Sequence, residues 1–281
     1  PSERHWPRFA TKLQLAARLV EWLAPILKKA GKTVWVVVDG GYTKRPFLRR
    51  VLRIPNLVIV SRLRKDAALR DLPAKSKPGQ RRGRGRPRKY GVHKISLAKR
   101  AGQRRGWETV ECTLYGETVT KCYKTFLATY GPVGGVIRVV LVREDHGWYA
   151  FACTDPEQSI VAILEAFADR ATIEQDFHDL KEVWGTGQQQ VRNIWTNLAV
   201  YNLNLWMHTL VELWAWHRDG KELRNRSDSP WDDAERRPSH ADRRKALRQH
   251  ILRNELSAVT GNTHLPRKII QLTKRLMALA A

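Results

Sequence analysis

The chain has few cysteines and no long apolar run. Its three cysteines, Cys112, Cys122 and Cys153, form no C-x2-C pair, so the sequence indicates neither a disulfide framework nor a zinc site. No segment approaches the roughly 18 apolar residues of a membrane helix, and the first residues contain no apolar signal core. We therefore expect a cytoplasmic protein. The chain also lacks an initiator methionine, so we expect it to be part of a longer protein.

Acidic residues are few compared with basic ones. The 281 residues include 51 Lys and Arg against 27 Asp and Glu, which gives a formal net charge of +24. Such an imbalance indicates a polyanionic partner, most commonly nucleic acid, although a ribosomal or membrane-surface role fits charge alone. A hydrophobic content of 42% with 11 tryptophans indicates a folded protein with a sizeable core rather than a disordered one.

The first 74 residues predict a β-α-β arrangement. A helix is expected from the N-cap Thr11, followed by a buried strand over 33–38, a short helix over 47–52 and a second strand over 57–60. This order predicts two parallel neighbours in one sheet. The first strand ends at Asp39-Gly40-Gly41, which delivers a carboxylate to the carboxyl edge of the sheet, where open α/β sheets place their chemistry.

A basic segment follows. Residues 75–105 contain 13 Lys or Arg and no acidic residue, which predicts a solvated inserted arm. The run Arg84-Gly85-Arg86-Pro87 resembles an AT-hook, which would lie in the minor groove of A·T-rich DNA. A flexible basic linker that contacts phosphates without sequence preference is an equally good interpretation. Either way, we expect DNA contacts from Arg84, Arg86, Arg88 and Lys89.

Antiparallel strands are predicted at 109–114, 117–122, 136–142 and 147–154, the last two joined by a hairpin turn at 144–147. A helix is then expected to begin at Asp155, with Asp155 as N-cap and Pro156 in its first turn. In this helix Arg170, Glu174 and Lys181 share one stripe. The residues Ile173, Phe177, Leu180 and Trp184 form a neighbouring stripe that is expected to face the core.

The charged stripe allows two interpretations. Glu174 could be one ligand of a divalent-metal site, with Arg170 and Lys181 holding phosphates beside it. Alternatively, the three side chains form ordinary exposed charge pairs, each of which stabilises the helix by only about 0.3 kcal/mol.

The pattern Phe167-x2-Arg170-x3-Glu174-x6-Lys181 resembles the Tyr-x2-Arg-x3-Glu-x6-Lys signature of DDE transposases of the insertion-sequence-four type, with Phe167 replacing the tyrosine. The segment 36–42 is similar to the strand that carries the second catalytic aspartate of that family. The resemblance implies Asp39 and Glu174 as catalytic acids and metal ligands, and Arg170 and Lys181 as DNA-binding residues. It implies Mg²⁺ or Mn²⁺ as cofactor, and in-line phosphoryl transfer that cleaves and joins DNA at transposon ends.

The resemblance also implies an α/β fold, a ribonuclease-H-like mixed sheet with flanking helices that is interrupted by a basic β-rich insertion. Residues 1–74 and 131–216 would be the two parts of the catalytic core, 75–130 the insertion and 217–281 a charged C-terminal tail. DNA is the implied partner, bound by a homodimer in a synaptic complex, in a bacterial cytoplasm and associated with the nucleoid. No membrane partner is implied.

The family's first acid lies on an earlier strand, which we expect to be absent from this chain. One metal should then bind poorly, and the chain alone should show no strand transfer. A different alignment makes Asp39 the first acid and Asp155 the second, but the N-cap role of Asp155 argues against it. A DNA-binding remnant without catalysis, another ribonuclease-H-like nuclease, and a ribosomal or RNA-binding protein remain as alternatives.

The remainder of the chain predicts helices. The segment 191–216 is expected to be a packing helix, with Trp195, Leu198, Trp206, Leu210 and Trp214 against the core. Its asparagines are expected to cap or to line a polar face, and His208 to be a core or surface histidine rather than a ligand, since it has no acidic or histidine partner at i+4. Residues 242–255 could form a charged helix or a solvated tail.

Overall fold

Two units make up the protein. The computed structural model describes residues 9–74, 85–224, 231–233, 235–260, 269–272 and 275. The chain divides into one unit over Pro1–Thr172 and a second over Ile173–Ala281, each of which is described by itself. The predicted segment 131–216 is thus shared between the two units.

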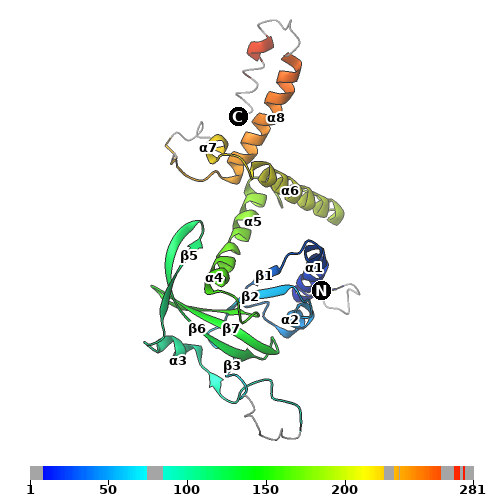
Figure 1. The fold of residues 1–281 in the computed structure, drawn as a ribbon. Coiled ribbons are helices and arrows are strands. Elements are labelled where there is room, and N and C mark those ends of the chain that lie inside the picture. Colours follow the sequence, from blue (N-terminus) through cyan, green and yellow to red (C-terminus); the bar gives the residue numbers. More distant parts are fainter. Residues whose placement is uncertain are drawn as a thin grey trace. The chain divides into compact units, whose positions relative to one another are not determined.

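The first unit is built around one sheet (Figure 1). Its elements are, in chain order, α1 (Lys12–Lys29), β1 (Val34–Val38), α2 (Arg45–Val51), β2 (Leu57–Leu63), β3 (Leu69–Arg70), β4 (Lys94–Ile95), α3 (Leu97–Gly102), β5 (Glu108–Leu114), β6 (Glu117–Tyr130), β7 (Gly135–Glu144), β8 (Gly147–Cys153) and α4 (Ile160–Asp169).

The sheet has eight strands and is mixed. The strand order is β1-β2-β8-β7-β6-β3-β4, with β5 paired to β6. The strands β1 and β2 are parallel, as their β-α-β order predicted, with Val38 opposite Ser61. The other pairings are antiparallel. The predicted mixed α/β sheet with flanking helices is confirmed, and it is consistent with a ribonuclease-H-like fold.

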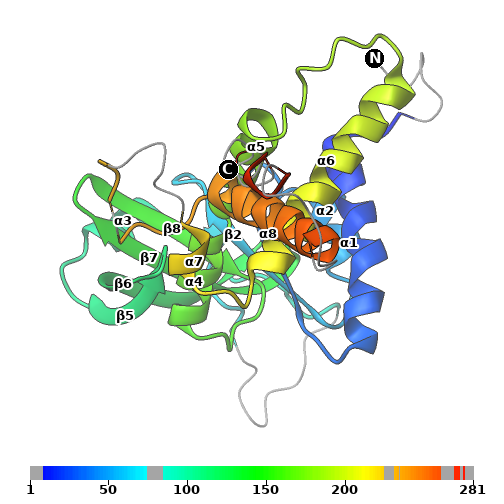
Figure 2. The ribbon, with the colours of Figure 1, turned by 90° about the horizontal axis from the view of Figure 1, so that it is seen from above.

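Helices cover both faces of this sheet. Strand residues alternate between the faces, so Val60 and Ile59 belong to different core clusters. Val60 packs with Ile163 and Leu164 of α4 on one face. Ile59 packs on the other face with residues of α1 and α2. On that same face, residues of β7 and β8 pack against α3. Figure 1 shows α1 and α2 at the end of the sheet formed by β1 and β2, and Figure 2 shows them on the side of the sheet where β2 lies.

The helix starts follow capping rules, with one correction. Thr11 is the N-cap of α1, as predicted, and it forms a capping box with Gln14. The prediction that Asp155 is the N-cap of the next helix is wrong, because α4 begins at Ile160 and its cap is Ser159, whose side chain accepts a hydrogen bond from the Ala162 N–H. Asp155 instead closes a turn before that helix.

The single helix expected from Asp155 to Trp184 is two helices. The first, α4, ends at Asp169, and α5 (Thr172–Glu182) begins after Arg170 and Ala171. The expectation that Arg170 and Glu174 share one stripe of a single continuous helix is therefore wrong. The predicted core stripe also fails in part, since Ile173 and Phe177 are each 47% exposed while Leu180 is buried.

The second unit consists of α5, α6 (Ile194–Ala215), α7 (Gly220–Leu223) and α8 (His240–Thr260). The expected packing face of α6 is wrong, because Trp195, Trp206 and Leu210 are 75%, 68% and 56% exposed. The helix is apolar nearly all round, so periodicity could not identify its buried side, which contains His208, Val211 and Ala215. Among the described residues, no helix combines the length and apolar character needed to cross a membrane.

Candidate functional site

The turn after β1 fixes the position of the Asp39 carboxylate. The Tyr42 N–H donates to the Asp39 carbonyl at 3.0 Å, and the Gly41 N–H donates to Asp39 Oδ1. Both glycines lie where a side chain would be tightly packed. A Cβ at Gly40 would lie 3.0 Å from the Arg62 carbonyl oxygen, and a Cβ at Gly41 would lie 3.0 Å from Asp39 Oδ1. The carboxylate is exposed at the carboxyl end of the strand, as the sequence predicted.

Asp39 lines an open cavity of about 580 Å³ at the edge where β1 and β2 end. The lining residues are Asp39, Gly40, Gly41, Lys44, Arg62, Leu63, Arg64, Lys65, Phe167 and Arg170. Five of these side chains are cationic, and Asp39 supplies the only carboxylate among them. A concave surface with this charge composition is suited to an anion such as a phosphate, with one carboxylate beside it.

Aromatic rings hold several of these cations. Arg170 Cζ lies 5.5 Å from the centroid of Phe167, which itself packs on Phe151 at a centroid distance of 4.6 Å. Arg62 Cζ lies 4.4 Å from the centroid of Tyr149. Such cation–π contacts position a guanidinium without removing its positive charge, which is what recognition of an anion requires.

Two residues of the predicted signature line the same cavity as the predicted acid Asp39. Asp39, Phe167 and Arg170 are far apart in sequence, yet all three line it. Phe167 is half-buried against Phe151, so the ring that replaces the family's tyrosine has an apolar packing role here.

Asp155 lies elsewhere on the sheet. The pairing of Val60 with Cys153 places Asp155 toward the start of β2, whereas Asp39 lies beyond Ser61 toward its end. The backbone positions of the two residues are thus about four strand residues apart, or roughly 13 Å, along β2. Asp155 Oδ1 accepts the Glu157 N–H at 3.0 Å and Oδ2 accepts from Gln158 Nε2 at 2.7 Å. The structure does not bring Asp155 together with Asp39.

The other predicted residues lie outside the cavity lining. Glu174 and Lys181 belong to the second unit, where both are exposed on α5. In the basic arm, Arg86, Arg88 and Lys89 are exposed, which leaves their charges accessible to DNA phosphates. Arg84 lies outside the described residues.

Four cationic residues of the cavity were not predicted from the sequence: Lys44, Arg62, Arg64 and Lys65. The signal that could have found the last three is their position directly at the end of β2. Because β2 is parallel to β1, residues that follow or end it reach the same sheet edge as Asp39.

The cavity residues fit a divalent cation in part. Mg²⁺ prefers hard oxygen ligands and often uses only one or two carboxylates together with substrate phosphates. Asp39 can supply one such ligand. The surrounding cations would repel a bare metal ion but attract the phosphate that brings further oxygen ligands, so the cavity suits a metal–phosphate pair better than a metal alone.

The second unit contains a different group of metal-ligating side chains. Asp179, His208 and His240 are all buried, and their ligand atoms lie within 4.8 Å of one another. His208 is buried, in agreement with one of the two environments expected for it. Its neighbours come from two other helices, which a search for partners at i+4 could not find.

The mixed sheet with flanking helices is consistent with the ribonuclease-H-like α/β fold of DDE nucleases. Residues 3–120 match the family described as DDE superfamily endonuclease, which supports a DDE-class, transposase-like family. The matched region includes β1, Asp39 and the basic arm. No curated protein matches the chain.

Proposed function

We propose that the protein is the catalytic region of a DDE transposase of the insertion-sequence-four type, which cleaves and joins DNA by metal-dependent phosphoryl transfer. The observation that carries this proposal is the basic cavity in which Asp39 lies beside Arg170 of the signature. The endonuclease family match over residues 3–120 supports it independently.

The roles of the chain's own residues follow from their chemistry. Asp39 and Glu174 would hold Mg²⁺ or Mn²⁺, which supplies activation of the attacking oxygen and stabilisation of the leaving oxygen. Arg170 would bind a backbone phosphate through its fork of donors, and Lys181 would bind one as a point charge. Arg62, Arg64 and Lys65 would add to the attraction for the DNA backbone. A working protein would join two DNA ends as a homodimer.

The test is nicking of supercoiled plasmid DNA by the purified chain with Mg²⁺ or Mn²⁺. We expect slow nicking that requires the metal and is lost in both Asp39→Asn and Glu174→Gln. Asparagine at position 39 can still accept the Gly41 N–H through its amide oxygen, so this variant should keep the turn. Asp145→Asn, in the exposed turn between β7 and β8, is the matched control and should nick like the parent protein.

Nicking that persists equally in both variants would contradict the assignment of these acids. A second candidate function, DNA binding without catalysis, is favoured by the excess of five cations over one carboxylate around the cavity. It predicts DNA binding in every variant and no metal-dependent nicking in the parent protein.

A further inference from the structure

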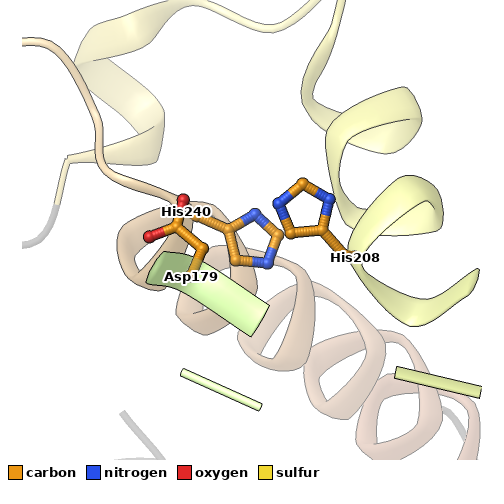
Figure 3. Close-up of side chains that lie close together, drawn as sticks. All are labelled: Asp179, His208 and His240. Atoms are coloured by element: carbon orange, nitrogen blue, oxygen red, sulfur yellow. The ribbon is translucent and has the colours of Figure 1, made fainter. Parts of the chain in front are cut away.

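Three buried side chains from three helices meet in the second unit. Asp179 lies on α5, His208 on α6 and His240 at the start of α8 (Figure 3). Their exposed fractions are 8%, 8% and 4%. Burial of three ionisable groups together is unfavourable unless hydrogen bonds or a bound ion compensates for the hydration that they give up.

The hydrogen bonds of His240 define its protonation state. The indole Nε1–H of Trp184 donates to His240 Nε2 at 2.8 Å, and because indole is a donor only, Nε2 carries no proton. The proton is therefore on Nδ1, which donates to Glu212 Oε1 at 2.7 Å. A neutral imidazole whose second nitrogen is held by a carboxylate is the arrangement usual for metal-ligating histidines.

The imidazole of His208 lies against that of His240. Its ring stacks on that of His240, with centroids 4.1 Å apart and an angle of 19° between the planes. The nearest acid, Asp176, has its Oδ1 3.9 Å from His208 Nε2, beyond direct hydrogen-bonding distance.

Asp179 provides an oxygen ligand. Its Oδ1 accepts from Gln175 Nε2 at 3.0 Å and contacts His178 Nδ1 at 3.4 Å. Within the described part of the chain, no hydrogen bond to its Oδ2 is found. One carboxylate oxygen is thus fixed in place while the other can serve a ligand.

The charge of this region favours a cation. Three carboxylates are close to the two imidazoles, namely Asp176, Asp179 and Glu212. Two guanidinium groups are nearby, Arg243 paired with Glu212 and Arg244 over the Trp184 ring at 4.6 Å. The three carboxylates outnumber the two guanidinium groups, which leaves negative charge for a bound cation to neutralise.

We propose that Asp179, His208 and His240 bind a divalent transition-metal ion of the zinc type, separate from the DNA chemistry, that joins α5, α6 and α8. Two imidazole nitrogens and one carboxylate oxygen suit Zn²⁺ and similar ions better than Mg²⁺. The ion replaces the Trp184 N–H at His240 Nε2. Asp176 or water completes the coordination.

The experiment is a titration of the full, chelator-stripped chain with Co²⁺, followed by competition with Zn²⁺. We expect one equivalent of Co²⁺ to give the intense visible absorption of a four-coordinate N/O site, Zn²⁺ to abolish it, and either ion to raise the Tm. His208→Gln and Asp179→Asn should each weaken binding at least about tenfold, as removal of supporting groups at metal sites already does. His146→Gln, at an exposed histidine, should leave it unchanged.

Trp184→Phe keeps the test decisive should the ligand variants lose their helical circular dichroism. This substitution removes the indole donor that competes for His240 Nε2, so it should tighten Co²⁺ binding. Absence of a one-equivalent site, binding that is unchanged in folded His208→Gln or Asp179→Asn, or weaker binding in Trp184→Phe would overturn the proposal. In that case the cluster is a polar network that joins the helices without an ion.

Discussion

The hydrogen bonds of a single carboxylate can show whether its role is structural or catalytic. Those of Asp155 indicate a structural role. Because it accepts two hydrogen bonds that close the turn before α4, we predict that Asp155→Ala lowers the free energy of unfolding by about 1 kcal/mol, the net contribution of a typical hydrogen bond. Plasmid nicking should persist at temperatures where the variant is folded. Thermal unfolding and the nicking assay measure the two effects.

The pH dependence provides the control. The hydrogen bond from Gln158, followed by that from the Glu157 N–H, lowers the pKa of Asp155 below its usual 3.8. Its stabilising contribution is therefore complete above pH 3.8 and is lost as the pH falls through the lower folded value. The stability difference between the parent protein and Asp155→Ala should shrink over that range. Loss of nicking in a stable Asp155→Ala protein would instead make Asp155 one of the catalytic acids.

The turn between β1 and α2 is the element on which the cavity depends. A methyl group at Gly40 would lie 3.0 Å from the Arg62 carbonyl, which belongs to the backbone of β2 and cannot rotate away. We predict that Gly40→Ala destabilises the protein by about 1 to 3 kcal/mol, as overpacking typically does, and weakens DNA binding by moving Asp39 and Arg62 apart. Chemical denaturation and DNA titration measure these two effects.

Gly102→Ala is the matched control for this substitution. Gly102 is the last residue of α3, and a methyl group there meets nothing within 4 Å. It should leave stability unchanged or raise it slightly, because alanine favours helix more than glycine does. A Gly40→Ala protein as stable as the parent would show that the end of β2 can move, and the fixed position of Asp39 would then not depend on this turn.

Elements with strong local signals were predictable from the sequence, and long-range groupings were not. The apolar run before Asp39 and the alternation in β5 to β8 identified these strands, because period and turn residues are local properties, although β6 extends eight residues beyond the predicted 117–122. The break between α4 and α5 contains neither Gly nor Pro, so no local signal marked it. The His208 cluster depends on the packing of three helices, which the order of residues along one helix cannot reveal.

The same limit explains the candidate site. Asp39 was predictable because a buried strand ends there, and the resemblance identified Arg170. Arg62 and Lys65 were missed because their role depends on the parallel pairing of β1 with β2, which brings their strand end to the same edge. To predict which side chains meet across a sheet, one needs to know the strand order and register as well as the sequence.

The net charge of +24 is spread over the entire chain, but the proposed DNA binding should depend on where the basic residues lie. We predict that the combined substitution Arg86→Gln, Arg88→Gln and Lys89→Gln reduces the slope of log K against log salt by about 0.9 for each DNA phosphate that is no longer neutralised, or up to roughly 3 in total. These three side chains are exposed, so the substitutions should leave the fold intact. Fluorescence anisotropy with duplex DNA at several salt concentrations gives the slope.

The control for this prediction removes the same charge elsewhere. Lys28, Lys29 and Lys32 are exposed at the end of α1, and their combined replacement by glutamine lowers the net charge by the same three units. If the basic arm contacts DNA directly, this control should keep nearly the parent slope, because ions are released only where phosphates are neutralised. Equal reductions in the two triple variants would mean that binding follows the total charge of the chain, and the arm would then have no specific role in DNA recognition.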